Sequence, residues 1–235
     1  MSQWYQPGLF LLHYDHAYSP ADDPPPGTGL DPEAIARLLR EVRPDAVHYT
    51  AKGHPGYVPY ATRFGNGLPP RLQDVDAPER DVLATYREIT TELGIRLVLG
   101  YSGLIDYHAA GRWPHWLRLT TQHAPYPNRA LCPNSGYVDE LMLPQLAEIL
   151  ERYAPDGIWI DADNWTVSPC YCPVCESEYQ MQHARSAPLD RRDPRWSEWL
   201  GFHRESFQRY LTRVGRYLHD RGPELVYASN GAFCT

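Results

Sequence analysis

Five short apolar runs recur along the chain, and segments with helical periodicity separate them. The runs lie at 9–14, 46–50, 96–101, 158–161 and 225–228. They are continuous rather than alternating, as expected for parallel strands that are covered on both faces. Parallel strands cannot be joined by tight hairpins and usually need a helical crossover. The pattern therefore predicts an α/β fold built on a parallel sheet.

Helix signals stand between the strands. Asp31 predicts the N-cap of a first helix, and Pro78 predicts the start of a second helix that Gly94 ends. Apolar stripes predict two further helices, over 137–153 and 196–218.

The links between elements are asymmetric. Links from helix to strand are short, for example at 43–45 and 154–156, whereas links from strand to helix are long. Ligand sites in such folds lie at the carboxyl ends of the strands, on the long loops. A closed barrel of eight β-α units usually takes about 250 residues, whereas this chain has only five such units in a similar length because its loops are long. We therefore expect a single (β/α) TIM-type barrel domain over 1–235, incomplete at the C-terminus. The alternative is an open sheet, or a sheet that another chain completes.

Charge and composition exclude several classes of protein. The formal net charge is −7 and the 22 basic residues are scattered, which argues against nucleic-acid or anionic-membrane partners. No apolar run is long enough to span a membrane, and the N-terminus has no signal-peptide pattern. The odd number of cysteines favours a cytoplasmic setting over a disulfide scaffold. The sequence leaves open whether the chain forms a homo-oligomer.

Four of the five cysteines have the spacing of a metal site. Cys170, Cys172 and Cys175 follow the fourth strand, and Cys132 lies in an earlier strand-to-helix loop on the same face of the sheet. Four thiolates are a preferred ligand set for structural Zn²⁺, so we expect a structural zinc. The alternatives are free thiols, a disulfide pair, or a catalytic zinc held by three cysteines and a water.

Two acids stand where the fourth strand ends. Strand alternation puts Asp161 and Asp163 on the same side, and the first should point into the mouth of the barrel. A carboxylate there can act as a nucleophile or general base in the cleavage of a glycosidic bond. The alternative, that these acids only cap a turn, applies mainly to Asp163.

Polar and aromatic residues gather at the same end of the other strands. A sugar needs such a ring of donors and acceptors together with aromatic faces. The candidates to bind a carbohydrate substrate are His13, His48, Lys52, His54, Tyr101, Trp159 and Asn230.

Three stretches resemble the α-L-fucosidase-like clan of retaining glycoside hydrolases, family 29 and the hypothetical glycosyl hydrolases related to it. They are GLFLLHYDHAYS at 8–19, YTAKGHPGYVPYATRFG at 49–65 and YVDELMLPQLAEILERYAPDGIWIDAD at 137–163. The resemblance implies a barrel, a substrate-binding role for His13 and a nucleophilic role for Asp161. Gly53 stands where the family usually has a first histidine of a pair, and no general acid/base glutamate can be carried over.

The cysteine pattern is similar to that of a different barrel family, the family 42 β-galactosidases. There a Cys-Pro-x-Ser stretch and a later Cys-x-Cys-x-x-Cys bind a structural zinc, and here LCPNSG and SPCYCPVC match them. Trp165 stands where that family has its acid/base glutamate, which argues against the same chemistry. The sequence thus predicts a retaining glycosidase. The alternatives are a non-catalytic carbohydrate-binding or scaffold protein, and a zinc-dependent hydrolase.

Overall fold

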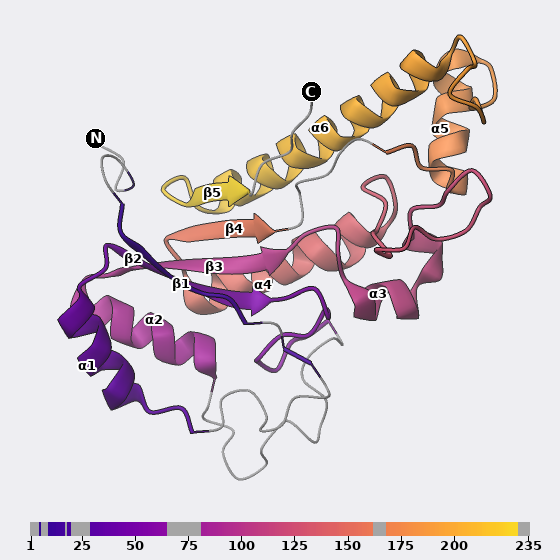
Figure 1. Ribbon diagram of the computed structural model, residues 1–235. Coiled ribbons are helices and arrows are strands. Elements are labelled where there is room, and N and C mark those ends of the chain that lie inside the picture. The colour runs from indigo at the N-terminus through magenta and orange to yellow at the C-terminus, as the bar shows by residue number, and fades with distance from the viewer. Residues whose placement is uncertain are drawn as a thin grey trace. The chain divides into compact units, whose positions relative to one another are not determined.

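The fold of the chain is given by a computed structural model that describes residues 5, 9–16, 18–19, 29–64, 81–161 and 168–229. Five strands form one sheet in the order in which they occur in the chain. They are β1 (Leu11–Tyr14), β2 (Ala46–Lys52), β3 (Arg96–Ser102), β4 (Gly157–Asp161) and β5 (Val226–Ser229). All five arrows point the same way (Figure 1). Strands that lie side by side in chain order are typical of a barrel wall. In a doubly wound sheet, by contrast, the order of the strands reverses at one point in the sheet. The predicted α/β class and its five β-α units are confirmed.

The chain divides into two compact units, which are described in turn. The first comprises 1–101, 145–159 and 224–228, and the second comprises 102–144, 160–223 and 229–235. The single domain over 1–235 stays a prediction.

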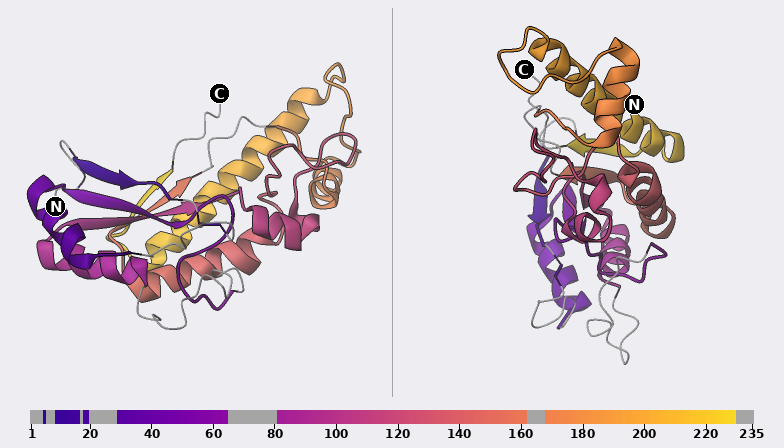
Figure 2. Two further views of the ribbon diagram at one scale, coloured as in Figure 1. Left: turned by 60° about the horizontal axis from the view of Figure 1, so that its bottom comes forward. Right: turned by 90° about the vertical axis from the view of Figure 1, so that its right-hand side faces the viewer.

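Three helices of the first unit cover one face of the sheet (Figures 1 and 2). They are α1 (Pro32–Val42), α2 (Val82–Leu93) and α4 (Leu143–Tyr153), whose first two residues belong to the second unit. Asp31 caps α1 as predicted, because its carboxylate accepts the amide N–H groups of the first turn at 3.0 Å. The rings of Tyr49 and Tyr86 lie 4.4 Å apart and pack β2 against α2.

Helix α2 begins later than the sequence predicted. Pro78 lies outside the described residues, and the helix starts at Val82 because the carboxylate of Asp81 accepts two first-turn N–H groups at 3.1 Å. Gly94 ends the helix as predicted, with φ of 67° in the left-handed region that favours glycine.

Strands β2 and β4 begin with the same Pro-Asp turn. The carboxylate of Asp45 accepts the N–H of Phe10 at 2.8 Å, and that of Asp156 accepts the N–H of Leu97 at 2.9 Å. Each Asp carbonyl also accepts an N–H from the following strand, at 3.1 and 3.0 Å. One residue type thus joins three neighbouring strands at the amino edge of the sheet.

Asp156 is also the partner of two guanidinium groups. Its carboxylate lies 2.6 Å from Arg96 and 3.0 Å from Arg87. Burial opposes ionisation of this carboxyl, but the N–H of Leu97 and the two arginines outweigh it and lower its pKa. The ionised form therefore stabilises the fold above the carboxyl's ordinary pKa of about 3.9, and this contribution is lost as the pH falls through the lowered pKa.

We expect Asp156→Asn to lower the free energy of unfolding at pH 7 by about 1–3 kcal/mol, because the substitution removes a charge-assisted partner of three donors. Below about pH 4 the difference from wild type should shrink, since wild type loses the same ionised group there. Urea unfolding at a series of pH values measures both. Glu41→Gln, at an exposed carboxylate of α1, is the control and should change stability by less than about 0.5 kcal/mol. Equal effects of the two variants would contradict the prediction.

The second unit is mostly helical. It contains α3 (Tyr107–Arg112), α5 (Pro173–His183) and α6 (Trp196–Arg221), with a π-helical turn at Val138–Met142 that leads into α4. Its core is aromatic and joins Tyr171, Tyr179, Trp199 and Phe202 to four buried cysteines. The sequence predicted α6 but neither α3, which is short, nor α5, whose hydrophobic periodicity is weak. Among the described residues, no helix has the length and apolar character needed to cross a bilayer.

Candidate active site

Two histidines and a tryptophan form a ring cluster on the sheet of the first unit. His13 and His48 are partners across β1 and β2, and their rings stack at 3.9 Å with 10° between the planes. Trp159 on β4 meets both rings edge-on, at 6.4 and 6.2 Å. His48 is 3% exposed, whereas His13 is open to solvent. The cluster thus offers polar nitrogens and an aromatic surface side by side, as a sugar site requires.

Gly100 makes room for this cluster. A Cβ atom added at Gly100 would lie 2.4 Å from Nε2 of His48, so β3 turns its bare backbone toward the histidine ring. Two residues earlier, Val98 lies against the Cβ position of Gly157 on β4. Since side chains alternate along a strand, Gly157, Trp159 and Asp161 lie on one face of β4. The ring of Trp159 meets those of His13 and His48, and we call the sheet face that bears these three rings the histidine face.

Asp161 is the last residue of β4, and its backbone is fixed within the second unit. The carbonyl of Asp161 accepts the N–H of Gly103 at 2.8 Å, and the carbonyl of Gly103 accepts the hydroxyl of Tyr137 at 2.8 Å. Tyr137 is fully buried. A buried phenol thus holds, through one intervening residue, the backbone that carries the candidate nucleophile.

Lys52 and Tyr101 lie on the other face of the sheet. The hydroxyl of Tyr101 donates to Gln145 of α4 at 2.8 Å, and the ammonium of Lys52 lies 4.3 Å above the tyrosine ring. Both side chains are buried. A register shift between Thr50 and Lys52 disturbs the alternation of β2 at this point. The structure therefore groups these two residues with α4, away from the face on which we expected them to line the mouth.

The remaining sugar-binding candidates are dispersed. His54 is half-buried in the tight turn that follows β2, where the N–H of Gly56 donates to the carbonyl of Gly53 at 3.0 Å. Asp163 and Asn230 lie outside the described residues. The roles of all three stay predictions.

The four cysteines with metal-like spacing do come together, within the second unit. The sulfurs of Cys132, Cys170, Cys172 and Cys175 all lie within 4.8 Å of one another, and all four side chains are buried. They come from two segments that are far apart in the sequence, as predicted for a shared site.

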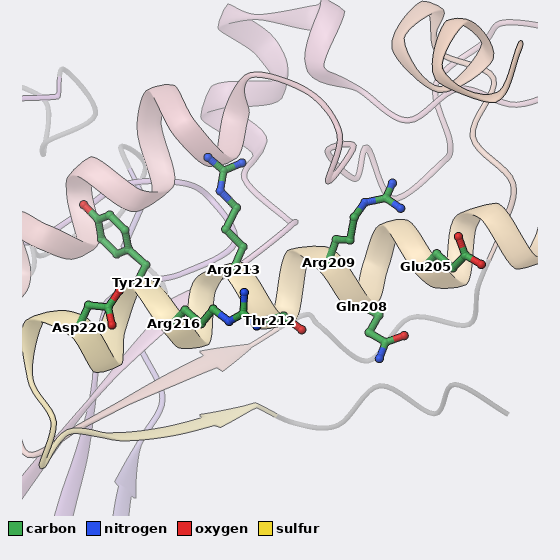
Figure 3. Close-up of a pocket in the computed structure, with 8 residues that line it drawn as sticks. All are labelled: Glu205, Gln208, Arg209, Thr212, Arg213, Arg216, Tyr217 and Asp220. Atoms are coloured by element: carbon green, nitrogen blue, oxygen red, sulfur yellow. The ribbon is translucent and has the colours of Figure 1, made fainter. Parts of the chain in front are cut away.

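A separate hollow of about 670 Å³ runs along α6 (Figure 3). Most of its lining residues are charged and all come from one helix, and two of its arginines are paired, Arg213 with Asp139 and Arg209 with Glu178. Sugar sites usually draw their side chains from several elements, whereas this hollow is lined by a single helix, so the histidine face is the stronger candidate.

A comparison with protein families decides the assignment. The model of the family described as Alpha-L-fucosidase matches residues 26–194, which is well over half of the chain. The chain belongs to the alpha-L-fucosidase family. The predicted resemblance to this family is thereby confirmed, and two of the three stretches, 49–65 and 137–163, lie within the matched residues. No curated protein matches the chain.

Solved fucosidases share the fold. Alpha-L-fucosidase isoenzyme 2 from Paenibacillus thiaminolyticus is 21% identical with a TM-score of 0.78, over 95% of this chain and 32% of the fucosidase. An alpha-L-fucosidase from Vibrio sp. strain EJY3 is 16% identical with a TM-score of 0.52, over 90% of this chain and 28% of the other. A hypothetical protein from Ruminiclostridium thermocellum is 11% identical with a TM-score of 0.53, over 85% and 90%. This chain thus spans about a third of the length of these fucosidases.

Sequence reasoning missed two residues that support the candidate site residues, Gly100 beside His48 and Tyr137 behind the backbone of Asp161. The close approach at Gly100 could have been predicted, because a glycine inside an apolar strand often marks a place where another group comes close to the backbone. The role of Tyr137 could not, since its place at the start of a predicted helix does not reveal that its hydroxyl reaches the loop after β3.

We expect Gly100→Ala to destabilise the fold by about 1–3 kcal/mol, because the new methyl group would overlap the buried ring of His48. Gly201→Ala is the control: it lies within α6 with no atom within 4 Å of its Cβ position, so it should stabilise by up to about 1 kcal/mol. Denaturant unfolding measures both. A Gly100→Ala protein as stable as wild type would show that the ring of His48 is not held against β3.

Proposed function

We propose that this chain contributes the strand ends that bind and cleave the substrate in a retaining glycoside hydrolase of the α-L-fucosidase type. The observation that carries the proposal is the position of Asp161, the last residue of β4, on the same face of that strand as Trp159, whose ring meets those of His13 and His48. Membership of the family supports the reaction class, and the departure at Gly53 leaves the sugar to be decided by experiment.

Each part of the site has a role in the proposed reaction. The carboxylate of Asp161 attacks the anomeric carbon, the bond to the leaving oxygen breaks, and a general acid protonates that oxygen. Water then attacks the glycosyl ester at the same carbon and releases the sugar with Asp161 as the free carboxylate. The nitrogens of His13 and His48 would bind sugar hydroxyls, and Trp159 would cover an apolar face of the ring.

A carboxylate nucleophile must be held in line with the anomeric carbon, since small displacements cost large factors in rate. The hydrogen bonds from Gly103 to Asp161 and from Tyr137 to Gly103 serve this need, because they fix the backbone directly at the nucleophile. Neither bond depends on the substrate, so the geometry is in place before binding.

The two alternative functions find less support. A zinc hydrolase needs an open coordination position, whereas the candidate ligand set here is four buried thiols. A binding protein without activity would not need a carboxylate at the carboxyl end of β4.

We expect Asp161→Asn to lower kcat on aryl α-L-fucosides, or on whichever aryl glycoside of a panel the full-length protein cleaves, by on the order of 10³-fold or more. Azide added to Asp161→Gly should restore turnover and yield a glycosyl azide of inverted configuration, because azide then enters from the face that the carboxylate occupied. The control is Asp139→Asn, at an exposed carboxylate paired with Arg213, and it should keep wild-type activity.

Two outcomes would contradict the proposal. One is full activity in Asp161→Asn, which would remove the nucleophile assignment. The other is a folded full-length protein that binds sugars but cleaves no glycoside in the panel, which would favour the binding protein.

We expect His13→Phe to lower kcat/KM by about 10- to 100-fold, because phenylalanine keeps the ring stack on His48 but removes the nitrogens that would bind a hydroxyl. Thermal stability should stay close to wild type. The matched control is His219→Phe in the last turn of α6, with unchanged kinetics. Steady-state kinetics and a thermal melt of both variants test this, and an unchanged kcat/KM in His13→Phe would exclude His13 from substrate binding.

A further inference from the structure

The four-cysteine cluster of the second unit takes no part in the proposed glycosidase chemistry. Its thiols are buried beside Trp199, Phe202 and Tyr179, where solvent does not reach them. Buried cysteines often act only as small apolar side chains, but such packing does not require four sulfurs from two distant segments to converge within 4.8 Å. We propose that Cys132, Cys170, Cys172 and Cys175 bind one Zn²⁺ ion with a structural role, independently of any glycosidase activity.

The distances between the sulfurs fit this ion. Zn–S bonds of about 2.3 Å in a tetrahedron place the sulfurs about 3.8 Å apart. Cys132 lies 3.4 Å from Cys175 and 3.7 Å from Cys172, and all four sulfurs lie within 4.8 Å of one another. A disulfide would need sulfurs about 2.05 Å apart, and all four cysteines are free. The sulfurs are therefore close enough together to surround one tetrahedral ion.

Groups around the cluster suit thiolate ligands. The side-chain amide of Asn134 donates to the sulfur of Cys175 at 3.4 Å and to the hydroxyl of Ser206 at 3.1 Å. The N–H of Cys170 donates to Nε2 of His203 at 3.1 Å, which engages that nitrogen outside the metal site. Such outer hydrogen bonds orient ligands and disperse their charge.

The local fold already brings the two ligand segments together. The N–H of Cys132 donates to the carbonyl of Trp116 at 2.7 Å, and the N–H of Tyr171 donates to the carbonyl of Leu119 at 2.9 Å. The hydroxyl of Tyr126 donates to the carbonyl of Pro169 at 2.7 Å. The ion would lock this arrangement, and it would hold the chain at Cys170, nine residues after Asp161.

The ligand set decides between a structural and a catalytic ion. Four thiolates complete the coordination of zinc and leave no position for water or substrate. The side chains are also at most 1% exposed, so a substrate could not approach the ion. The inferred role is therefore to stabilise the second unit.

The test begins with the wild-type protein purified without chelator. Metal analysis should find one zinc per chain, and X-ray absorption at the zinc edge should find four sulfur neighbours at about 2.3 Å. Removal of zinc by a strong chelator under reducing conditions should lower Tm by on the order of 10 °C, and added Zn²⁺ should restore it. No zinc after refolding with Zn²⁺, or fewer than four sulfur neighbours, would overturn the proposal.

Two variants test the ligand set directly. Cys132→Ser removes the ligand from the distant segment and should abolish stoichiometric zinc binding or leave a protein of lower Tm that zinc does not stabilise. Cys234→Ser removes the remaining cysteine of the chain and should keep one zinc and the wild-type Tm. Loss of zinc from Cys234→Ser, or full retention of zinc and Tm in Cys132→Ser, would show that the ligands are assigned wrongly.

Discussion

The Pro-Asp turns before β2 and β4 set the register on which the rest of the sheet depends. In each turn, one aspartate uses its carboxylate and its backbone to join the strand on either side, at Asp45 and at Asp156. Parallel strands have no hairpin to fix their alignment, so these turns fix it at the amino edge of the sheet. Because side chains alternate with a period of two, a shift of one residue there would turn His48 and Trp159 away from each other at the other edge.

The sequence predicted the strands well, since continuous apolar runs that follow short links are typical of buried parallel strands. It also predicted which cysteines meet, because chain order alone puts both loops at the same edge of the sheet. It could not predict on which face each strand-end residue lies. Tyr101 follows Gly100 by one residue and therefore faces α4, and the register shift in β2 carries Lys52 to the same side.

Some helix boundaries could likewise be predicted from local sequence, and others could not. Gly94 and Asp31 act locally, through a left-handed backbone and a side-chain cap, and both were predicted. Asp81 and Pro78 are competing start signals three residues apart, and local sequence does not rank them. The position of Asp81 is decided by tertiary contacts, because Tyr153 and Arg152 of α4 donate to its carboxylate at 2.6 and 2.9 Å.

The absence of a side chain at Gly100 has an evolutionary consequence. The ring of His48 occupies the space that a Cβ atom at position 100 would need, so the sizes of the two residues are coupled. A relative with alanine or serine at position 100 could not keep a histidine at position 48 in this orientation. The two positions should therefore covary across the family, although 52 residues separate them in the chain, and a relative that lacks both residues would have a differently shaped face beside β4.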